Sequence, residues 1–434
     1  MNIKTLRSLF HYEKIGLSSA VTLTSKILTT ILAIISFPIL THTYSLNQVG
    51  DWYIFLGLSP FFMIIEGTIG GAFVNKLSKV EDKQNAYSKL MVRTYFYSTL
   101  KASFIYFIIF LLISLISYRL FPNRISTLIY LCIFGSVNIL FSFIQILDKI
   151  LIATGKIYRV QIADFLTALL QLVSIIICSK FYLGIYALTA IYLSIFFVIK
   201  LINYCCLSQS IEKLTWNDCI NTSKIKKWDE KHPLKDGLPF MVVILASSLG
   251  TSIDLLLLRL ISDDPADIVF MAYLQRFFAL FAFVGTISIP LWPLFNKQIS
   301  EGKIEDAMHG TRILAFIYCA AAIILSILVL FVNSYFESRF LPENLKIPIS
   351  ILVVGLITRS CTLMGECFSP VMQGSLFIKK LAYIAIITCI LSLSIKPFLI
   401  LNYSLMGLNV ANALIYGLIY ASLCYFFIKS TFAK

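Results

Sequence analysis

The stretch Leu207 to Asp236, LSQSIEKLTWNDCINTSKIKKWDEKHPLKD, is the longest polar run in this 434-residue chain. It lies just before the midpoint, and long apolar segments flank it on each side. A polar run in this position is typical of a connector between two membrane-embedded halves. The sequence therefore predicts an N-terminal lobe at residues 1–206, a cytoplasmic connector at 207–236 and a C-terminal lobe at 237–434.

The composition indicates a membrane protein. Hydrophobic residues make up 59% of the chain and charged residues 13%, against about 25% charged residues in ordinary soluble domains. The apolar runs are about 20 residues or longer, which is enough for a helix to cross a hydrocarbon core of about 30 Å. Strands of a membrane barrel would instead be short and alternating. The sequence predicts an all-α polytopic membrane protein.

Twelve apolar segments are long enough to be spans, six on each side of the connector. They cover residues 15–41, 52–75, 94–118, 126–147, 160–179, 182–204, 237–258, 268–295, 313–333, 347–372, 381–400 and 405–427. The first follows a short basic segment and is too long for a signal peptide, so we expect it to be a retained helix.

The basic residues indicate the orientation of the spans. Lys and Arg gather in the even-numbered connections and at both termini, whereas the odd-numbered connections hold few of them. By the positive-inside rule, both termini are expected to be cytoplasmic. Lys200 and Lys396, in the last turns of spans 6 and 11, are expected to extend their amines to the membrane surface. Because orientation accounts for the formal charge of +14, no nucleic-acid partner is expected.

The two halves share features in the same order. The segment after span 2, NKLSKVEDKQNA from Asn75, parallels NKQISEGKIEDA from Asn296 after span 8, and Gly-containing turns follow spans 4 and 10 at Gly155 and Gly374. Transporters are often built from such duplicated helix bundles. We therefore expect twelve transmembrane helices in two pseudo-symmetric six-helix lobes around a central cavity.

Basic residues deep within spans are the first functional candidates, because a charge in the membrane is costly and usually faces a bundle interior or a wet cavity. Lys26, Arg276 and Arg359 predict a cationic cavity for an anionic headgroup, since guanidinium and ammonium groups suit phosphate oxygens. The alternative is that they pair with carboxylates to fix helix packing, for instance Arg359 with Glu66 or Arg276 with Asp254.

Three carboxylates form the second set of candidates. Glu66, Asp254 and Glu366 could bind a coupling ion, because a desolvated carboxylate can take up a proton more readily, or they could form charge pairs. Glu366 follows Arg359 by seven residues, two helical turns, and so shares its helix face.

No enzyme, metal or cofactor motif occurs in the sequence. The ten cysteines form no CxxC pair, the four histidines form no HExxH signature, and no Gly-rich phosphate loop is present. We therefore expect no catalytic residues, no metal site and no cofactor.

Three segments carry a family resemblance. They are IATGKIYRVQIADF (Ile152 to Phe165), DPADIVFMAYLQRFF (Asp264 to Phe278) and PLWPLFNKQISEGKIEDA (Pro290 to Ala307). With the twelve spans and inside termini, the chain resembles the polysaccharide repeat-unit (O-antigen) flippases of the multidrug/oligosaccharidyl-lipid/polysaccharide exporter superfamily. This resemblance implies a bacterial inner-membrane protein that moves an undecaprenyl-pyrophosphate-linked oligosaccharide from the cytoplasmic to the periplasmic leaflet by alternating access, for O-antigen, lipopolysaccharide or related polysaccharide synthesis.

The resemblance also implies the partners and leaves two alternatives. The expected partners are the lipid-linked oligosaccharide, membrane lipids and other polysaccharide-assembly proteins, with a monomer as the expected state. A multidrug exporter of the same superfamily is one alternative, although a cavity for cationic drugs should be acidic. A membrane polysaccharide polymerase or ligase is the other, although such enzymes carry a large outer loop and the outer connections here are short.

Overall fold

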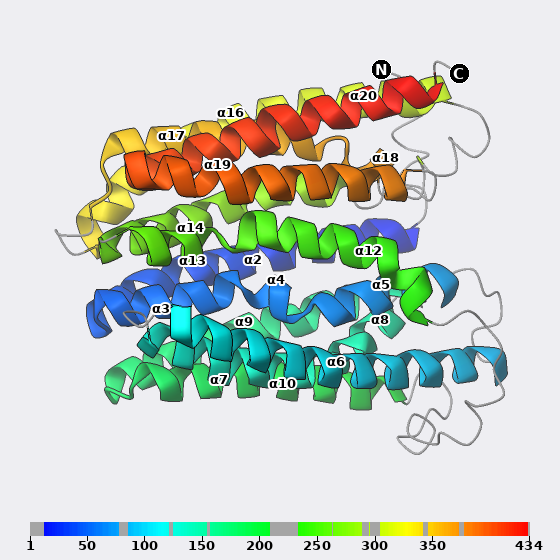
Figure 1. Ribbon diagram of the computed structural model, residues 1–434, viewed down its shortest axis with the longest axis horizontal. Helices are drawn as coiled ribbons and strands as arrows, with labels where there is room; N and C mark the ends of the chain where they lie inside the picture. Colours follow the sequence, from blue (N-terminus) through cyan, green and yellow to red (C-terminus); the bar gives the residue numbers. More distant parts are fainter. Residues whose placement is uncertain are drawn as a thin grey trace. The chain divides into compact units, whose positions relative to one another are not determined.

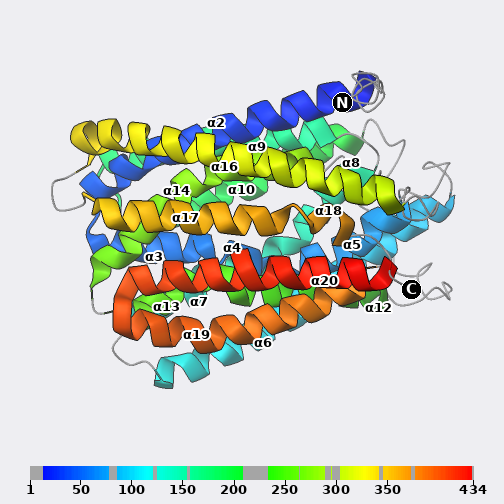
Figure 2. The ribbon, with the colours of Figure 1, turned by 90° about the horizontal axis from the view of Figure 1, so that it is seen from above.

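The computed structural model describes residues 13–77, 86–120, 125–153, 157–208, 233–262, 264–288, 295, 304–341, 346–372 and 377–432, which form helices and no strand. Helices are expected here, because only they satisfy every backbone polar group within one segment of chain surrounded by lipid. Figures 1 and 2 show these helices from two directions.

The first six expected spans correspond to single or broken helices. In chain order these are α2 (Glu13–Thr43), α3 (Leu46–Gly57), α4 (Ser59–Phe62), α5 (Ile64–Leu77), α6 (Ala86–Leu120), α7 (Ile125–Phe141), η2 (Ser142–Gln145), α8 (Ile146–Ala153), α9 (Ile157–Lys180) and α10 (Ile185–Ser208). Span 2 is divided into three short helices near Pro60, which cannot donate a backbone hydrogen bond. Span 4 contains the 3₁₀ turn η2.

The last six expected spans also correspond to single or broken helices. They consist of α12 (Pro233–Ser247), η4 (Ser248–Ser252), α13 (Asp254–Ile261), α14 (Pro265–Ser288), α16 (Ile304–Phe340), α17 (Ile349–Glu366), α18 (Ser369–Met372), α19 (Ile378–Asn412), η6 (Ala413–Ile419) and α20 (Tyr420–Phe432). Both η4 and η6 are π-helical turns. Within this half, α17, α19 and α20 lie side by side in both views.

Eight of the described helices are long and apolar enough to cross a membrane, and a pair bent by 43°, Met241–Ser252 with Asp254–Ile261, brings the number to nine. The 52-residue segment Lys379–Ser430 counts once among them, although it turns at Ser404, where φ is 50°. Each of the twelve expected spans coincides wholly or partly with a helix or broken helix. The predicted all-α polytopic membrane fold is confirmed.

The turn at Ser404 corrects the expected end of span 11. The helix continues past residue 400 to Ser404, so Lys396 lies two turns before the end of the helix. A side chain at Gly407 would collide with the backbone carbonyl of Leu399. Glycine is therefore required for the two arms of α19 to approach each other this closely.

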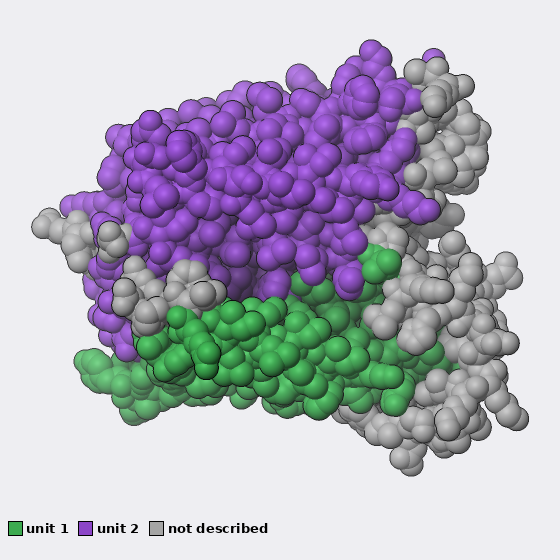
Figure 3. Space-filling model, in the orientation of Figure 1, with its two compact units in different colours: residues 1–36, 62–238 green, residues 37–61, 239–434 purple. Residues whose placement is uncertain are grey.

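The chain divides into two compact units, coloured separately in Figure 3. The first comprises Met1–Ser36 and Phe62–Leu238, and the second comprises Phe37–Phe61 and Pro239–Lys434. Residues 37–61 thus group with the second unit, although the sequence assigns them to the first six spans. The predicted lobe boundaries stay a prediction, and most of the connector at 207–236 lies outside the described residues.

Contacts of residues 37–61 explain this grouping. Within the second unit, the ring centroids of Phe37 and Tyr273 are 5.0 Å apart. The buried side chain of Arg259 donates to Asn47 at 2.9 Å and lies 3.6 Å from the carboxylate of Asp51. Aromatic packing and a buried guanidinium therefore join the ends of spans 1 and 2 to α13 and α14.

Large apolar side chains cover long faces of the outer helices. Leu112 and Leu115 on α6, and Phe316 and Phe331 on α16, are 56–76% exposed. In water, such continuous apolar faces would be unfavourable. In a bilayer they are the surfaces that contact lipid, as the composition predicts.

Candidate functional site

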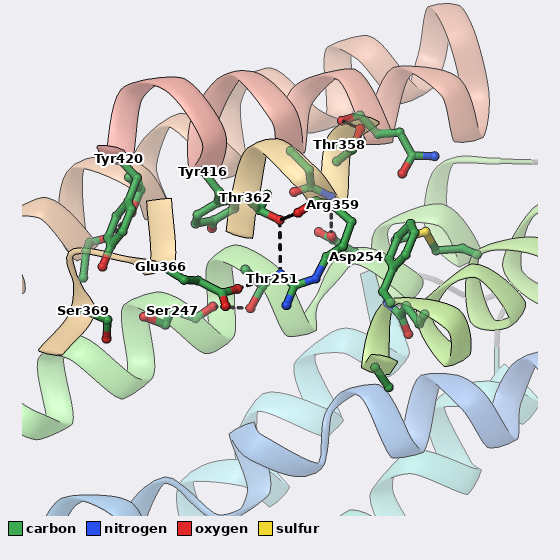
Figure 4. A pocket seen from close by; sticks show the side chains of 18 of the residues that line it. Ser247, Thr251, Asp254, Thr358, Arg359, Thr362, Glu366, Ser369, Tyr416 and Tyr420 are labelled. Atoms are coloured by element: carbon green, nitrogen blue, oxygen red, sulfur yellow. Dashed lines mark hydrogen bonds and ion pairs between the residues drawn. The ribbon is translucent and has the colours of Figure 1, made fainter. Parts of the chain in front are cut away.

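The second unit contains a cavity of about 540 Å³. Its wall is formed by side chains from α12, η4, α13, α14, α17, α18, α19, η6 and α20. Most of these side chains are polar, and they include Asp254, Arg359 and Glu366, three of the six residues that the sequence singled out. Figure 4 shows these three charged side chains among hydroxyl and tyrosine side chains of the wall.

Arg359 and Glu366 form an ion pair on one face of α17. One terminal nitrogen of Arg359 lies 2.6 Å from Glu366 Oε1 and also donates to the hydroxyl of Thr362 at 3.1 Å. The seven-residue spacing that places both residues on one face is the reason for this contact. Glu66, the other partner that the sequence suggested for Arg359, lies in the first unit and binds Lys149 Nζ at 2.9 Å.

Asp254 lies in a buried network. Lys396 Nζ is 2.5 Å from Asp254 Oδ1, and Asn412 Nδ2 donates to Asp254 Oδ2 at 2.8 Å. Lys396 has no exposed side-chain surface, so the expectation that its amine extends to the membrane surface is wrong. The pairing of Arg276 with Asp254, which the sequence left open, does not form. Lys396 satisfies this carboxylate instead, because α19 continues beside α13.

The π-helical turn η4 gives the lysine a further partner. Lys396 Nζ donates to the carbonyl oxygen of Gly250 within this turn, and the amine lies 5.3 Å from the ring centre of Tyr416. π-Helical turns release backbone carbonyls from the regular pattern and occur often at functional sites. A side chain at Gly250 would collide with the Tyr416 hydroxyl, so glycine makes room for this tyrosine beside the turn.

The other candidate cations lie outside this cavity wall. Arg276 stacks over Tyr53, with its guanidinium carbon 4.8 Å from the ring centre, and is half-buried. Lys26 belongs to the first unit, and its side chain is exposed. Neither residue forms an ion pair with a residue that the structure describes. All three candidate carboxylates, by contrast, have a basic partner. Their roles in substrate or ion binding stay predictions.

The sequence missed a second buried network, in the first unit. Lys200 Nζ lies 2.5 Å from Asp148 and 2.6 Å from Asp164, and only 5% of the lysine side chain is exposed. Lys200 was expected to extend to the surface, as Lys396 was, and this is also wrong. The sequence does contain one indication that Lys396 is unusual. It lies at the expected outer end of span 11, whereas most basic residues lie at the cytoplasmic ends of spans, as the positive-inside rule predicts.

No group of three or more His, Cys, Asp and Glu side chains that could hold a metal ion occurs within the described part of the chain. The cavity offers hydrogen bonding from hydroxyls, amides and charged side chains, together with aromatic surface.

Comparison with solved structures identifies the fold. The chain superposes on the inward-facing conformation of a multidrug resistance MATE family transporter of the MOP superfamily with a TM-score of 0.70. The sequences are 14% identical, and the match covers 96% of this chain and 98% of the other. The chain therefore shares the fold of this transporter. No family model and no curated protein matches the sequence.

Two further solved structures share this fold. The lipid II flippase MurJ in an inward closed conformation matches with a TM-score of 0.62 and 18% identity, over 95% of this chain and 87% of that chain. The eukaryotic MATE transporter AtDTX14 matches with a TM-score of 0.64 and 12% identity, over 96% and 95%. The chain therefore shares its fold with two MATE transporters and a lipid II flippase.

Proposed function

We propose that this chain is a flippase that translocates an undecaprenyl-pyrophosphate-linked oligosaccharide from the cytoplasmic to the periplasmic leaflet of a bacterial inner membrane. It works by alternating access and serves the synthesis of O-antigen or a related surface polysaccharide. Both termini are cytoplasmic, and the protein acts as a monomer beside other polysaccharide-assembly proteins. The MOP-type fold, shared with a lipid II flippase, supports transport of a lipid-linked substrate.

The distribution of paired and unpaired charges carries this proposal. Among the described residues, Glu66, Asp254 and Glu366 each bind a basic side chain, whereas Lys26 and Arg276 have no carboxylate partner. The uncompensated charges within the spans are therefore positive. Positive charge favours an anionic pyrophosphate.

The alternative is an ion-coupled multidrug exporter, and one observation favours it. The superposition on a MATE multidrug transporter is better than that on the lipid II flippase, with TM-scores of 0.70 and 0.62. A cationic drug, however, would need an uncompensated carboxylate within the spans. The charge distribution among the described residues therefore favours the flippase.

The decisive experiment measures leaflet translocation of a fluorescent undecaprenyl-pyrophosphate oligosaccharide in proteoliposomes. Lys26→Ala and Arg276→Gln should each reduce the rate by about tenfold or more, because each removes a charge-assisted contact to the headgroup. Lys101→Ala is the matched control, since Lys101 is an exposed lysine on α6 and its loss should leave the rate within about twofold.

Two results would contradict the proposal. If the wild-type protein moves no lipid-linked oligosaccharide but extrudes a cationic dye under an ion gradient, the multidrug function is correct. If Lys26→Ala and Arg276→Gln transport at the rate of the Lys101→Ala control, these cations do not bind the headgroup.

A further inference from the structure

We infer that the cavity in the second unit binds a neutral sugar residue of the transported molecule, and not its pyrophosphate. This inference rests on the proposed function, and it assigns to Arg359 a different ligand from the anionic headgroup that the sequence suggested. Four features of the wall carry it: charge balance, hydrogen-bonding capacity, unpartnered polar atoms and aromatic surface.

The charges of the wall are balanced. Arg359 is neutralised by Glu366 at 2.6 Å, and Asp254 is neutralised by the buried amine of Lys396 at 2.5 Å. A pyrophosphate here would meet two carboxylates and no free cation, which is electrostatically unfavourable. A cationic drug would meet no uncompensated carboxylate. The wall therefore favours a ligand without net charge.

The threonine hydroxyls of the wall require a ligand that donates hydrogen bonds. The wall includes the hydroxyls of Ser247, Thr251, Thr362 and Ser369, labelled in Figure 4. Thr251 and Thr362 already donate their protons to the carbonyls of Ser247 and Arg359, so their hydroxyl oxygens are left to accept from a ligand. A fully ionised phosphate offers acceptors alone, whereas each hydroxyl of a sugar can donate one hydrogen bond and accept others.

Three buried polar atoms of wall residues have no hydrogen-bond partner within the described structure: Arg359 Nε, Asn409 Oδ1 and Asn412 Oδ1. The amide orientations follow from their partners, since Nδ2 of Asn409 donates to the carbonyl of Leu405 and Nδ2 of Asn412 donates to Asp254. Both partners only accept, so each Oδ1 is left as an unsatisfied acceptor.

Unsatisfied buried polar atoms cost free energy and often mark a ligand that would satisfy them. One donor nitrogen and two acceptor oxygens match the mixed capacity of a polyol. The atoms are buried, and the residues that carry them line the cavity. A hydroxyl of a bound sugar is a partner of the right kind for each of them, because it can both donate and accept.

The size and aromatic content of the cavity fit the same ligand. Its volume of about 540 Å³ falls in the range of roughly 300–1,000 Å³ that is usual for small-molecule sites. Phe278, Tyr416 and Tyr420 line it. Aromatic rings offer apolar surface for the C–H face of a sugar ring, and the tyrosines add a polar hydroxyl.

The test is ligand-detected NMR on the full chain in lipid nanodiscs, with the methyl glycosides of glucose, galactose, mannose and N-acetylglucosamine as probes. At least one glycoside should bind the wild-type protein. Thr251→Val/Thr362→Val removes two wall hydroxyls without changing side-chain shape, and it should weaken this binding at least fivefold. Thr94→Val is the matched control, because Thr94 makes the same bond to the carbonyl four residues earlier on α6, and it should bind as the wild type does.

The inference is overturned if no glycoside binds the wild-type protein, or if the double variant binds as tightly as Thr94→Val. It is also overturned if tetraphenylphosphonium or inorganic pyrophosphate binds the wild-type protein and the double variant loses the binding of that ion. Translocation measured on the same preparations separates the two proposals. Transport without glycoside binding leaves the flippase standing and removes the sugar site, whereas glycoside binding without lipid translocation removes the flippase and keeps the site.

Discussion

Lys26 and Lys396 are both lysines within membrane helices, yet their surroundings are opposite. Lys396 has no exposed side-chain surface and is held by Asp254, Gly250 and the ring of Tyr416. Lys26 is exposed on α2 and forms no ion pair with a described residue. A buried, fully satisfied charge fixes packing, whereas an exposed, unsatisfied one is available to a ligand. Depth in a span therefore does not by itself predict the role of a charge.

The largest effect on stability is expected from Lys396→Met. This change leaves the carboxylate of Asp254 buried without a cation and should lower the free energy of unfolding by about 3–5 kcal/mol. Reversible unfolding in mixed micelles measures this free energy. The double variant Lys396→Met/Asp254→Asn should recover most of the loss, because no buried charge remains. A double variant as unstable as the single one would show that packing, rather than charge, is lost.

An intermediate effect is expected from Arg359→Gln. Its partner Glu366 is 40% exposed, so water partly solvates the carboxylate that remains. The free energy of unfolding should therefore fall by only about 1 kcal/mol. The same unfolding assay applies, with Arg359→Gln/Glu366→Gln as the control. A loss as large as that of Lys396→Met would mean that Arg359 is a packing residue, and the distinction between the cavity pair and the buried pair would disappear.

The smallest effect on stability, within about 0.5 kcal/mol, is expected from Lys26→Met, since the exposed amine has no described carboxylate partner. Unfolding and lipid translocation are measured on the same preparation, and translocation alone should fall. If Lys26→Met unfolds as readily as Lys396→Met, Lys26 is structural and the contrast between the two lysines fails.

The sequence predicts the ion-pair partner of some site residues but not of others. Arg359 and Glu366 could be paired in advance, because a seven-residue separation on one helix fixes their common face. Asp254 and Lys396 could not, since they are 142 residues apart in sequence and meet only through the packing of α13 on α19. The unexpected partner of Glu66, Lys149, has the same origin in the packing of α5 on α8.

The sequence by itself determined that this is an all-α membrane protein with twelve apolar segments, because segment length and hydropathy are local properties that the bilayer selects directly. Tertiary structure alone decided which charges are neutralised. A side chain of Lys or Arg reaches several neighbouring helices, and helix breaks such as η4 and the turn at Ser404 set which carboxylate or carbonyl lies within its reach. For that reason three predicted site residues share one cavity wall, whereas Lys26, Glu66 and Arg276 do not line it.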